Sequence, residues 1–158
     1  MGILNLSYYK ELKQLVEQKT SSIRTGKELF ADPTFLELLN LKASIENQVF
    51  YNRKNYYFSL IQKYLNEKIS SNVFQAEFVT MVKEDQKKYQ EIRDNFEKLS
   101  TFWIDLESKE FGSLFANIHE MCLSAIEFGY DENAMSETQF RDSIQDSFFK
   151  MQKYFNKE

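Results

Sequence analysis

The stretch Leu60–Phe78, LIQKYLNEKISSNVFQAEF, contains in succession the sequence signals of a helix end, a tight turn and a helix start. Apolar residues before Asn66 repeat at helical spacing, and Asn66 itself is a tolerated helix-ending residue. Ser70 or Ser71 can then cap the free amides of a second helix, which begins with an aromatic stripe. Nothing in this stretch performs chemistry, so it predicts architecture rather than activity.

Other local signals extend this pattern along the chain. Asp32-Pro33 is a strong helix start, because Asp caps free amides and Pro occupies the first helical position. Ser136 with Gln139 three residues later forms a capping box.

The segment 34–66 is one helix or two, with a bend expected near residues 51–55. The helices are expected from Ser7 to Lys19, from Pro33 towards Leu65, from Ser70 or Ser71 through Trp103, from about Leu114 to Gly129 after a connection at Glu107–Gly112, and from Ser136 to Phe155.

Composition supports an all-α fold in a single domain. The chain has 158 residues, of which 42% are hydrophobic and 28% charged, with one Pro and four Gly. These values argue against disorder and against turn-rich β folds. Fifteen Phe and nine Tyr predict a core of aromatic rings that cross between helices.

Charge is distributed unevenly between the two halves of the chain. Residues 1–68 contain ten Lys and Arg against seven Asp and Glu, a net charge of +3, whereas residues 69–158 have a net charge of −7. An acidic surface repels phosphate, so the second half is a poor candidate for nucleic acid and a better one for a basic protein. The alternative is an ordinary solvated helical surface with excess Glu.

No catalytic, metal-binding or cofactor-binding site is expected. His119 is the only histidine, so it cannot complete a zinc or di-iron site, and Cys122 lies on the apolar stripe, where thiols are usually inert. There is no glycine loop for phosphate and no nucleophile elbow. The sequence therefore indicates a protein that is not an enzyme.

The single cysteine and the absence of a long apolar run predict a soluble protein of a reducing compartment. Sixteen Lys against four Arg, with many Asn, Ile, Phe and Tyr, suggest an AT-rich genome, such as that of a plastid or a low-GC bacterium. We expect the cytoplasm or the plastid stroma, without a membrane span.

Acidic residues interrupt the apolar stripe of the third expected helix. Asp85 falls on the stripe beside Glu84, so either the helix kinks there or a carboxylate is held at the edge of the core. Together with Glu91 and Asp94, these residues could cluster on adjacent turns and bind Lys and Arg of a partner. The alternative is a solvated face with ion pairs to Lys87, Lys88 and Lys98.

The segments YLNEKIS (64–70), FQAEFVTMVKED (74–85) and YDENAMSETQFRDSIQ (130–145) resemble the bacterial self-protective colicin-like immunity family of the colicin D type. The resemblance covers residues 57–155. It implies an antiparallel bundle of four to five helices at residues 56–158, with a helical extension at residues 1–55. It also implies a non-enzymatic protein that binds a basic tRNA-cleaving toxin domain.

On this resemblance the partner-binding residues are acidic, and the family motif does not assign them one by one. They are Glu84, Asp85, Glu91, Asp94, Asp131 and Glu132. The alternative function is that of a structural or assembly subunit of a larger, possibly plastid-encoded complex, in which the N-terminal helices dock.

Overall fold

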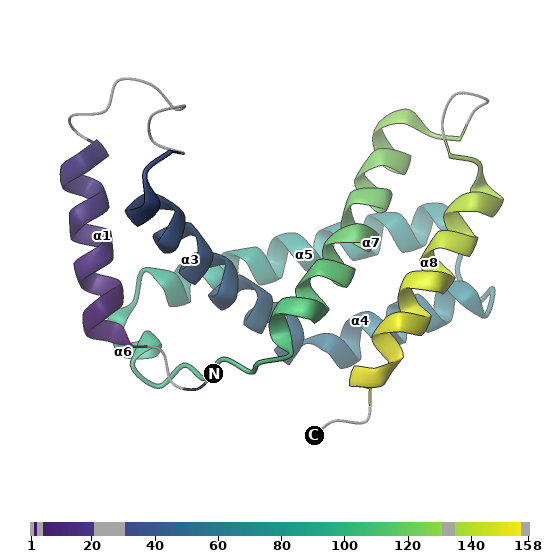
Figure 1. The fold of residues 1–158 in the computed structure, drawn as a ribbon. Coiled ribbons are helices and arrows are strands. Elements are labelled where there is room, and N and C mark those ends of the chain that lie inside the picture. The colour runs from purple at the N-terminus through teal and green to yellow at the C-terminus, as the bar shows by residue number, and fades with distance from the viewer. Residues whose placement is uncertain (1, 3–4, 21–30, 131–134, 156–158) are drawn as a thin grey trace.

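The computed structural model describes residues 2, 5–20, 31–130 and 135–155, and in this part of the chain the regular elements are helices (Figure 1). They are α1 (Leu6–Thr20), α3 (Pro33–Asn52), α4 (Lys54–Leu65), α5 (Ser71–Arg93), α6 (Phe96–Leu99), α7 (Ser108–Phe128), α8 (Glu137–Met151) and the 3-10 turn η1 (Gln152–Tyr154). No β-strand forms among these residues, so the predicted all-α fold is confirmed.

The predicted helix starts are confirmed by their hydrogen bonds. Asp32 caps α3, because its Oδ1 accepts a hydrogen bond from the amide of Thr34 at 2.8 Å, and Pro33 is the first helical residue. Of the two serines proposed for α5, Ser70 is the cap, with its Oγ 3.2 Å from the amide three residues on. Ser136 and Gln139 form the reciprocal capping box of α8.

The end of α4 is a Schellman motif with Asn66 as the C-cap, as predicted. The amide of Lys68 donates to the carbonyl of Lys63 at 2.9 Å, and the amide of Glu67 donates to the carbonyl of Tyr64 at 3.0 Å. Glu67 has a φ of 60°, the left-handed conformation that glycine adopts most easily at this position. The turn between α4 and α5 is therefore set by backbone hydrogen bonds within six residues.

Arg141 of α8 fastens this turn to the rest of the bundle. Its guanidinium donates to the carbonyls of Tyr64 and Leu65 in the last turn of α4 and lies 5.2 Å from the centre of the Tyr64 ring. A side chain from residue 141 thus completes a helix end that lies more than seventy residues earlier.

Residues 34–66 form two helices rather than one. α3 ends at Asn52 and α4 begins at Lys54, so the bend lies within the interval 51–55 that the sequence suggests. Arg53 at the bend has a φ of −102° and a ψ of 8°. The two helices leave this point in different directions (Figure 1).

Two sequence predictions about helix boundaries are wrong. The helix that starts after Ser70 ends at Arg93 instead of running to Trp103, because Asn95 starts a new turn by accepting from two amides of α6 at 3.1 and 3.2 Å. Trp103 is 54% exposed instead of continuing the buried stripe. The expected connection at Glu107–Gly112 is instead the first turn of α7, which begins at Ser108.

Gly112 lies inside α7 because the helix crosses α3 closely at this residue. A Cβ atom at Gly112 would lie 2.2 Å from Oδ1 and 2.4 Å from Cγ of Asn47. Glycine here leaves room for a side chain of another helix and does not mark a turn, which explains why its position misled the prediction from sequence.

The buried apolar residues form two clusters. The C-terminal cluster contains Phe50, Tyr51, Tyr57, Phe58, Leu60, Ile61, Tyr64, Phe74, Phe78, Val79, Val82, Phe111, Phe115, Ile118, Cys122, Phe140, Ile144, Phe148, Met151 and Tyr154. The N-terminal cluster contains Tyr9, Leu12, Val16, Leu38, Ile45, Val49, Tyr89, Leu99 and Ile104.

Helices α3 and α5 contribute to both clusters, since α5 crosses the molecule and α3 runs from the side of α1 to the middle, where α4 begins (Figure 1). The N-terminal extension predicted at residues 1–55 therefore shares its core with residues 89–104. The division into residues 1–55 and 56–158 stays a prediction. Among the described helices, none has the length and hydropathy needed to cross a bilayer.

Candidate functional site

Asp85, the acidic residue that interrupts the apolar stripe, is only 1% exposed. The hydroxyl of Tyr57 donates to its Oδ2 at 2.6 Å, and Arg53 Nε and Lys88 Nζ lie 3.4 and 3.5 Å from its Oδ1. Burial and the hydrogen bond to Asp85 raise the pKa of Tyr57, so its phenol stays protonated and donates. α5 continues through Asp85 without a break, and the carboxylate holds the α3–α4 bend against it.

Glu84 and Glu91 are exposed on α5, and the exposed Asp94 is its C-cap. Glu84 and Glu91 are seven residues apart, which places them about 10 Å apart along the helix axis rather than on adjacent turns. Asp94 forms an ion pair with Arg93 at 3.2 Å, and the hydrogen bond from Arg93 lowers the pKa of Asp94. α5 therefore displays these charges along its length and does not gather them at one point.

The other two predicted residues, Asp131 and Glu132, lie outside the described residues. Both belong to the connection between α7 and α8, whose flanking residues Tyr130 and Met135 are described.

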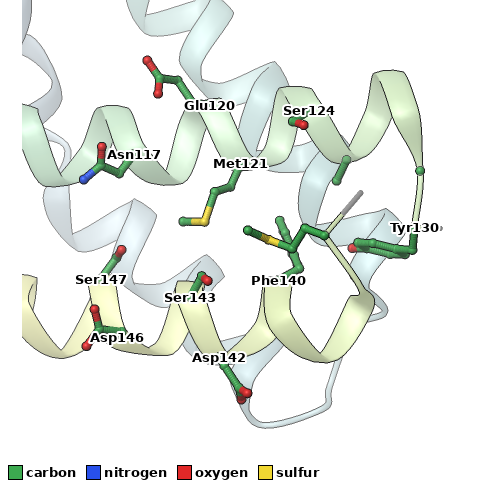
Figure 2. A pocket seen from close by; sticks show the side chains of 13 residues that line it. Asn117, Glu120, Met121, Ser124, Tyr130, Phe140, Asp142, Ser143, Asp146 and Ser147 are labelled. Atoms are coloured by element: carbon green, nitrogen blue, oxygen red, sulfur yellow. The ribbon is translucent and has the colours of Figure 1, made fainter. Parts of the chain in front are cut away.

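A cavity lies between α7 and α8 (Figure 2). It is an open groove of about 600 Å³. The two helices run antiparallel along it (Figure 1). Its lining consists of Asn117, Glu120, Met121, Ser124, Ala125, Gly129, Tyr130, Met135, Phe140, Asp142, Ser143, Asp146 and Ser147.

The middle of the groove is apolar and bordered by hydroxyl groups. Met121 extends from α7 into the space between the helices, where Phe140 and Ser143 of α8 lie (Figure 2). Met135 is partly exposed, whereas Phe140 is fully buried and belongs to the C-terminal cluster. The apolar surface is thus continuous with the core beneath it.

The carboxylates stand at the edges of the groove. Glu120 projects from α7 away from α8, and Asp142 projects from α8 away from α7 (Figure 2). Asp146 follows Asp142 by one helical turn and forms an ion pair with the exposed Lys150 at 3.0 Å. The described lining residues include these three carboxylates and no Lys, Arg or His.

One end of the groove is held by Tyr130. Its hydroxyl forms hydrogen bonds with Ser71 and Gln75 of α5, and burial raises its pKa. Gly129 just before it has a φ of 68° and a ψ of −158°, a conformation that a residue with a Cβ rarely adopts. The glycine that ends α7 therefore also directs Tyr130 towards α5.

Glu120, Asp142 and Asp146 were not identified from the sequence. A usable signal existed on α8, where Asp142 and Asp146 are one turn apart and fall between the core positions Phe140, Ile144 and Phe148. Their partner across the groove could not be identified without the packing of α7 against α8.

His119 and Cys122 do not form a reactive pair. Burial lowers the pKa of His119, whose ring lies 6.5 Å from that of Phe78. Cys122 is fully buried, and its burial raises the thiol pKa to about 12, so the nucleophilic thiolate is scarce at neutral pH. Within the described residues, no three His, Cys, Asp or Glu side chains are arranged to hold a metal ion.

Comparison with known proteins gives no match to a family model, to a curated protein or to a solved structure.

Proposed function

We propose that this chain is a non-enzymatic protein-binding module, of the colicin D type immunity kind, that binds a basic protein surface. The observation that carries the proposal is the groove between α7 and α8, which combines an apolar floor with carboxylates on both edges. Apolar burial provides affinity, and the carboxylates select a partner rich in Lys and Arg.

Charge supports a protein partner over a nucleic acid. Residues 69–158, which include both walls of the groove, have a net charge of −7. Phosphate groups are repelled by such a surface, whereas a basic nuclease domain is attracted and steered towards it. Each exposed ion pair contributes only about 0.2–1 kcal/mol, so affinity must also come from the apolar floor.

The acidic residues predicted from the sequence have different places in this proposal. Glu84 and Glu91 on α5 and Asp94 at its C-cap are exposed, but they do not line the groove, and Asp131 and Glu132 lie outside the described residues. Asp85 supports the surface from inside, because its oxygens are engaged by Tyr57, Arg53 and Lys88.

Inhibition of a purified basic, tRNA-cleaving nuclease domain of the colicin D type tests the proposal. We expect the chain to block tRNA cleavage, and the double variant Glu120→Lys/Asp142→Lys to lose at least about tenfold in inhibition, since two attractive contacts become repulsive. Glu97→Lys on α6 is the matched control, because this exposed carboxylate lies at the other side of the molecule. Equal inhibition by all three proteins would remove the groove from the proposal.

A docking role in a larger assembly is the second candidate, and the segment around Trp103 favours it. Trp103 and Leu106 are 54% and 76% exposed. The segment that carries them is held rigidly, because Gln48 exchanges two hydrogen bonds with Asp105 at 2.8 and 2.9 Å and Trp103 Nε1 donates to Asp105 at 3.1 Å. Exposed apolar side chains on a rigid support are typical of interface anchors.

Recovery of the native chain distinguishes the two candidates. A basic nuclease as the sole bound protein supports the immunity role, in the bacterial cytoplasm that the family implies. Stable recovery in a multisubunit particle supports the docking role, if it is lost in the Trp103→Ala/Leu106→Ala variant and retained in the Glu120→Lys/Asp142→Lys variant. For the docking role the AT-rich composition favours the plastid stroma.

A further inference from the structure

We infer that the groove between α7 and α8 binds its basic partner through one amphipathic α-helix, which carries an apolar stripe flanked by Lys or Arg. This inference rests on the proposed function and adds the form of the partner. It follows from the hydrogen-bonding groups that the groove provides, from its length and from the position of its carboxylates.

The walls of the groove provide side chains rather than backbone groups. Both walls are α-helices, whose peptide groups are bonded internally, and no β-strand edge borders the groove among the described residues. An extended peptide would bury its own amides and carbonyls against the apolar floor without partners for most of them. A helix satisfies its backbone internally and presents only side chains, so it avoids this loss.

The length of the groove fits a short helix. The lining residues of α7 extend from Asn117 to Ala125 and those of α8 from Phe140 to Ser147. At 1.5 Å per residue these walls are about 11–12 Å long, which corresponds to about two turns of a helix lying along them. An apolar stripe with residues at i, i+3 or i+4 and i+7 covers this distance.

The floor and the edges suit different side chains of the same helix. Met121 and Met135 are unbranched and adaptable, and they can pack against apolar residues of varied shape. Glu120 and Asp142 point outward on opposite sides of the groove (Figure 2). Lys and Arg on the two flanks of a bound helix can reach them, because their long stems lie along the apolar surface while their charges extend to the edges.

Asp142 and Asp146 add a spacing rule. They are four residues apart on α8, so their carboxylates are separated by about one turn, or 6 Å. A partner helix lying along α8 would match them with basic residues at i and i+4. Asp146 is already paired with Lys150, so Asp142 and Glu120 are expected to contribute more than Asp146.

Peptide binding to the full chain tests the inference. The probe is a synthetic peptide of about 14 residues with a Leu stripe at helical spacing and Lys on both flanks, a length at which an isolated helix is marginal in water. Its matched control has the same composition in an order that removes the stripe, so its net charge is unchanged. Binding is followed by calorimetry, peptide helicity by circular dichroism, and the site by the methyl resonances of Met121 and Met135.

We expect the amphipathic peptide to become helical on binding, to shift both methionine methyl resonances, and to bind at least about tenfold more tightly than the control peptide. In the Glu120→Lys/Asp142→Lys variant its affinity should fall by at least about tenfold, while Glu97→Lys should not change it.

Equal binding of the two peptides would overturn the inference and leave the proposed function standing, because charge alone would then explain recognition. Binding without helix formation, binding that leaves both methionine methyls unshifted, or no binding of either peptide would also overturn it. The proposed function fails separately, if the basic nuclease domain is not inhibited.

Discussion

The two core clusters differ in what fills them. The C-terminal cluster is a network of aromatic rings, with centroids 4.4 Å apart for Phe50 and Phe115 and 4.6 Å apart for Tyr64 and Phe74. The N-terminal cluster is smaller and mainly aliphatic, and partly buried Lys42 and Glu46 lie on the same stretch of α3 as its core residues. The half with the proposed binding groove therefore rests on the larger, aromatic core, whereas the other half places partly buried charged side chains beside a smaller aliphatic one.

The largest expected effect is the loss of a ring from the C-terminal cluster. Phe74 is 0% exposed and contacts Tyr64, Phe78 and Phe140. Phe74→Ala should lower the free energy of unfolding by about 4 kcal/mol, measured by urea denaturation. The exposed Phe149→Ala should change it by less than about 0.5 kcal/mol.

The same measurement on the N-terminal cluster tests the comparison directly. Leu12→Ala should lower the free energy of unfolding by about 2.5 kcal/mol, because its smaller side chain leaves a smaller cavity. A larger loss for Leu12→Ala than for Phe74→Ala would show that the aromatic network is not the stronger of the two cores.

The second prediction concerns the buried carboxylate near the junction of the two clusters. Asp85→Ala leaves the buried Tyr57 hydroxyl and the Arg53 guanidinium without their partner, so it should lower the free energy of unfolding by about 3 kcal/mol. Its exposed neighbour gives the control, since Glu84→Ala should have an effect below about 0.5 kcal/mol. Similar small effects of both changes would contradict an internal role for Asp85.

The third prediction concerns the crossing of α3 and α7. Gly112→Ala places a Cβ against the Asn47 side chain, which must then move, and this cost should exceed the gain in helix propensity, so the free energy of unfolding should fall by about 1 kcal/mol. Asn47→Ala removes the atoms that the new Cβ would meet. When Gly112→Ala is made in the Asn47→Ala protein, it should therefore cost much less stability than in the original chain. Purely additive effects in this double-mutant cycle would exclude the clash as the cause.

The fourth prediction is a stabilising change within the C-terminal half. Glu67 has a φ of 60°, and Glu67→Gly removes the unfavourable contact of its Cβ in this conformation. After the larger chain entropy of glycine in the unfolded state is subtracted, the free energy of unfolding should rise by about 0.5–1 kcal/mol. Thermal unfolding measures this gain. In the same experiment Lys68→Gly should give no gain, because Lys68 does not have a positive φ.

The smallest expected effect is a pH dependence of the N-terminal half. Burial raises the pKa of Glu46 in the folded chain above its usual value of 4.5. Between the pKa of the unfolded chain and the higher pKa of the folded chain, the folded chain therefore binds more protons. Stability therefore falls as the pH rises through this window, and the loss persists at neutral pH. Glu46→Gln should remove this dependence and raise the melting temperature at pH 7, whereas equal pH profiles of the two proteins would contradict it.

Sequence reasoning succeeded where a helix boundary depends on neighbouring residues. Asp32, Ser70 and Ser136 each accept a hydrogen bond from an amide two or three residues away, so their roles can be predicted from short motifs. It failed for residues 94–112. There Asn95 starts a new turn within an apparently continuous stripe, and Gly112 meets Asn47 of a distant helix.

The candidate site was predicted less well than the fold. The sequence predicted an acidic binding surface and pointed first to Glu84 and Asp85, and none of the six predicted residues is among the described residues that line the groove. The carboxylates that line the groove, Glu120, Asp142 and Asp146, could not be chosen from among the many exposed Asp and Glu residues. Their selection depends on how two helices pack, which residue spacing within one helix does not specify.

The sequence by itself determined the helical class, the caps and the turn at Asn66–Ser70, because these depend on hydrogen bonds and side-chain periodicity within a few residues. Only the tertiary structure decided the end of α5, the burial of Asp85 and the groove between α7 and α8. These features depend on contacts between residues far apart in the chain, such as Tyr57 with Asp85 and Gln48 with Asp105. Local patterns do not encode such contacts, because many packings of the same helices are compatible with one apolar stripe.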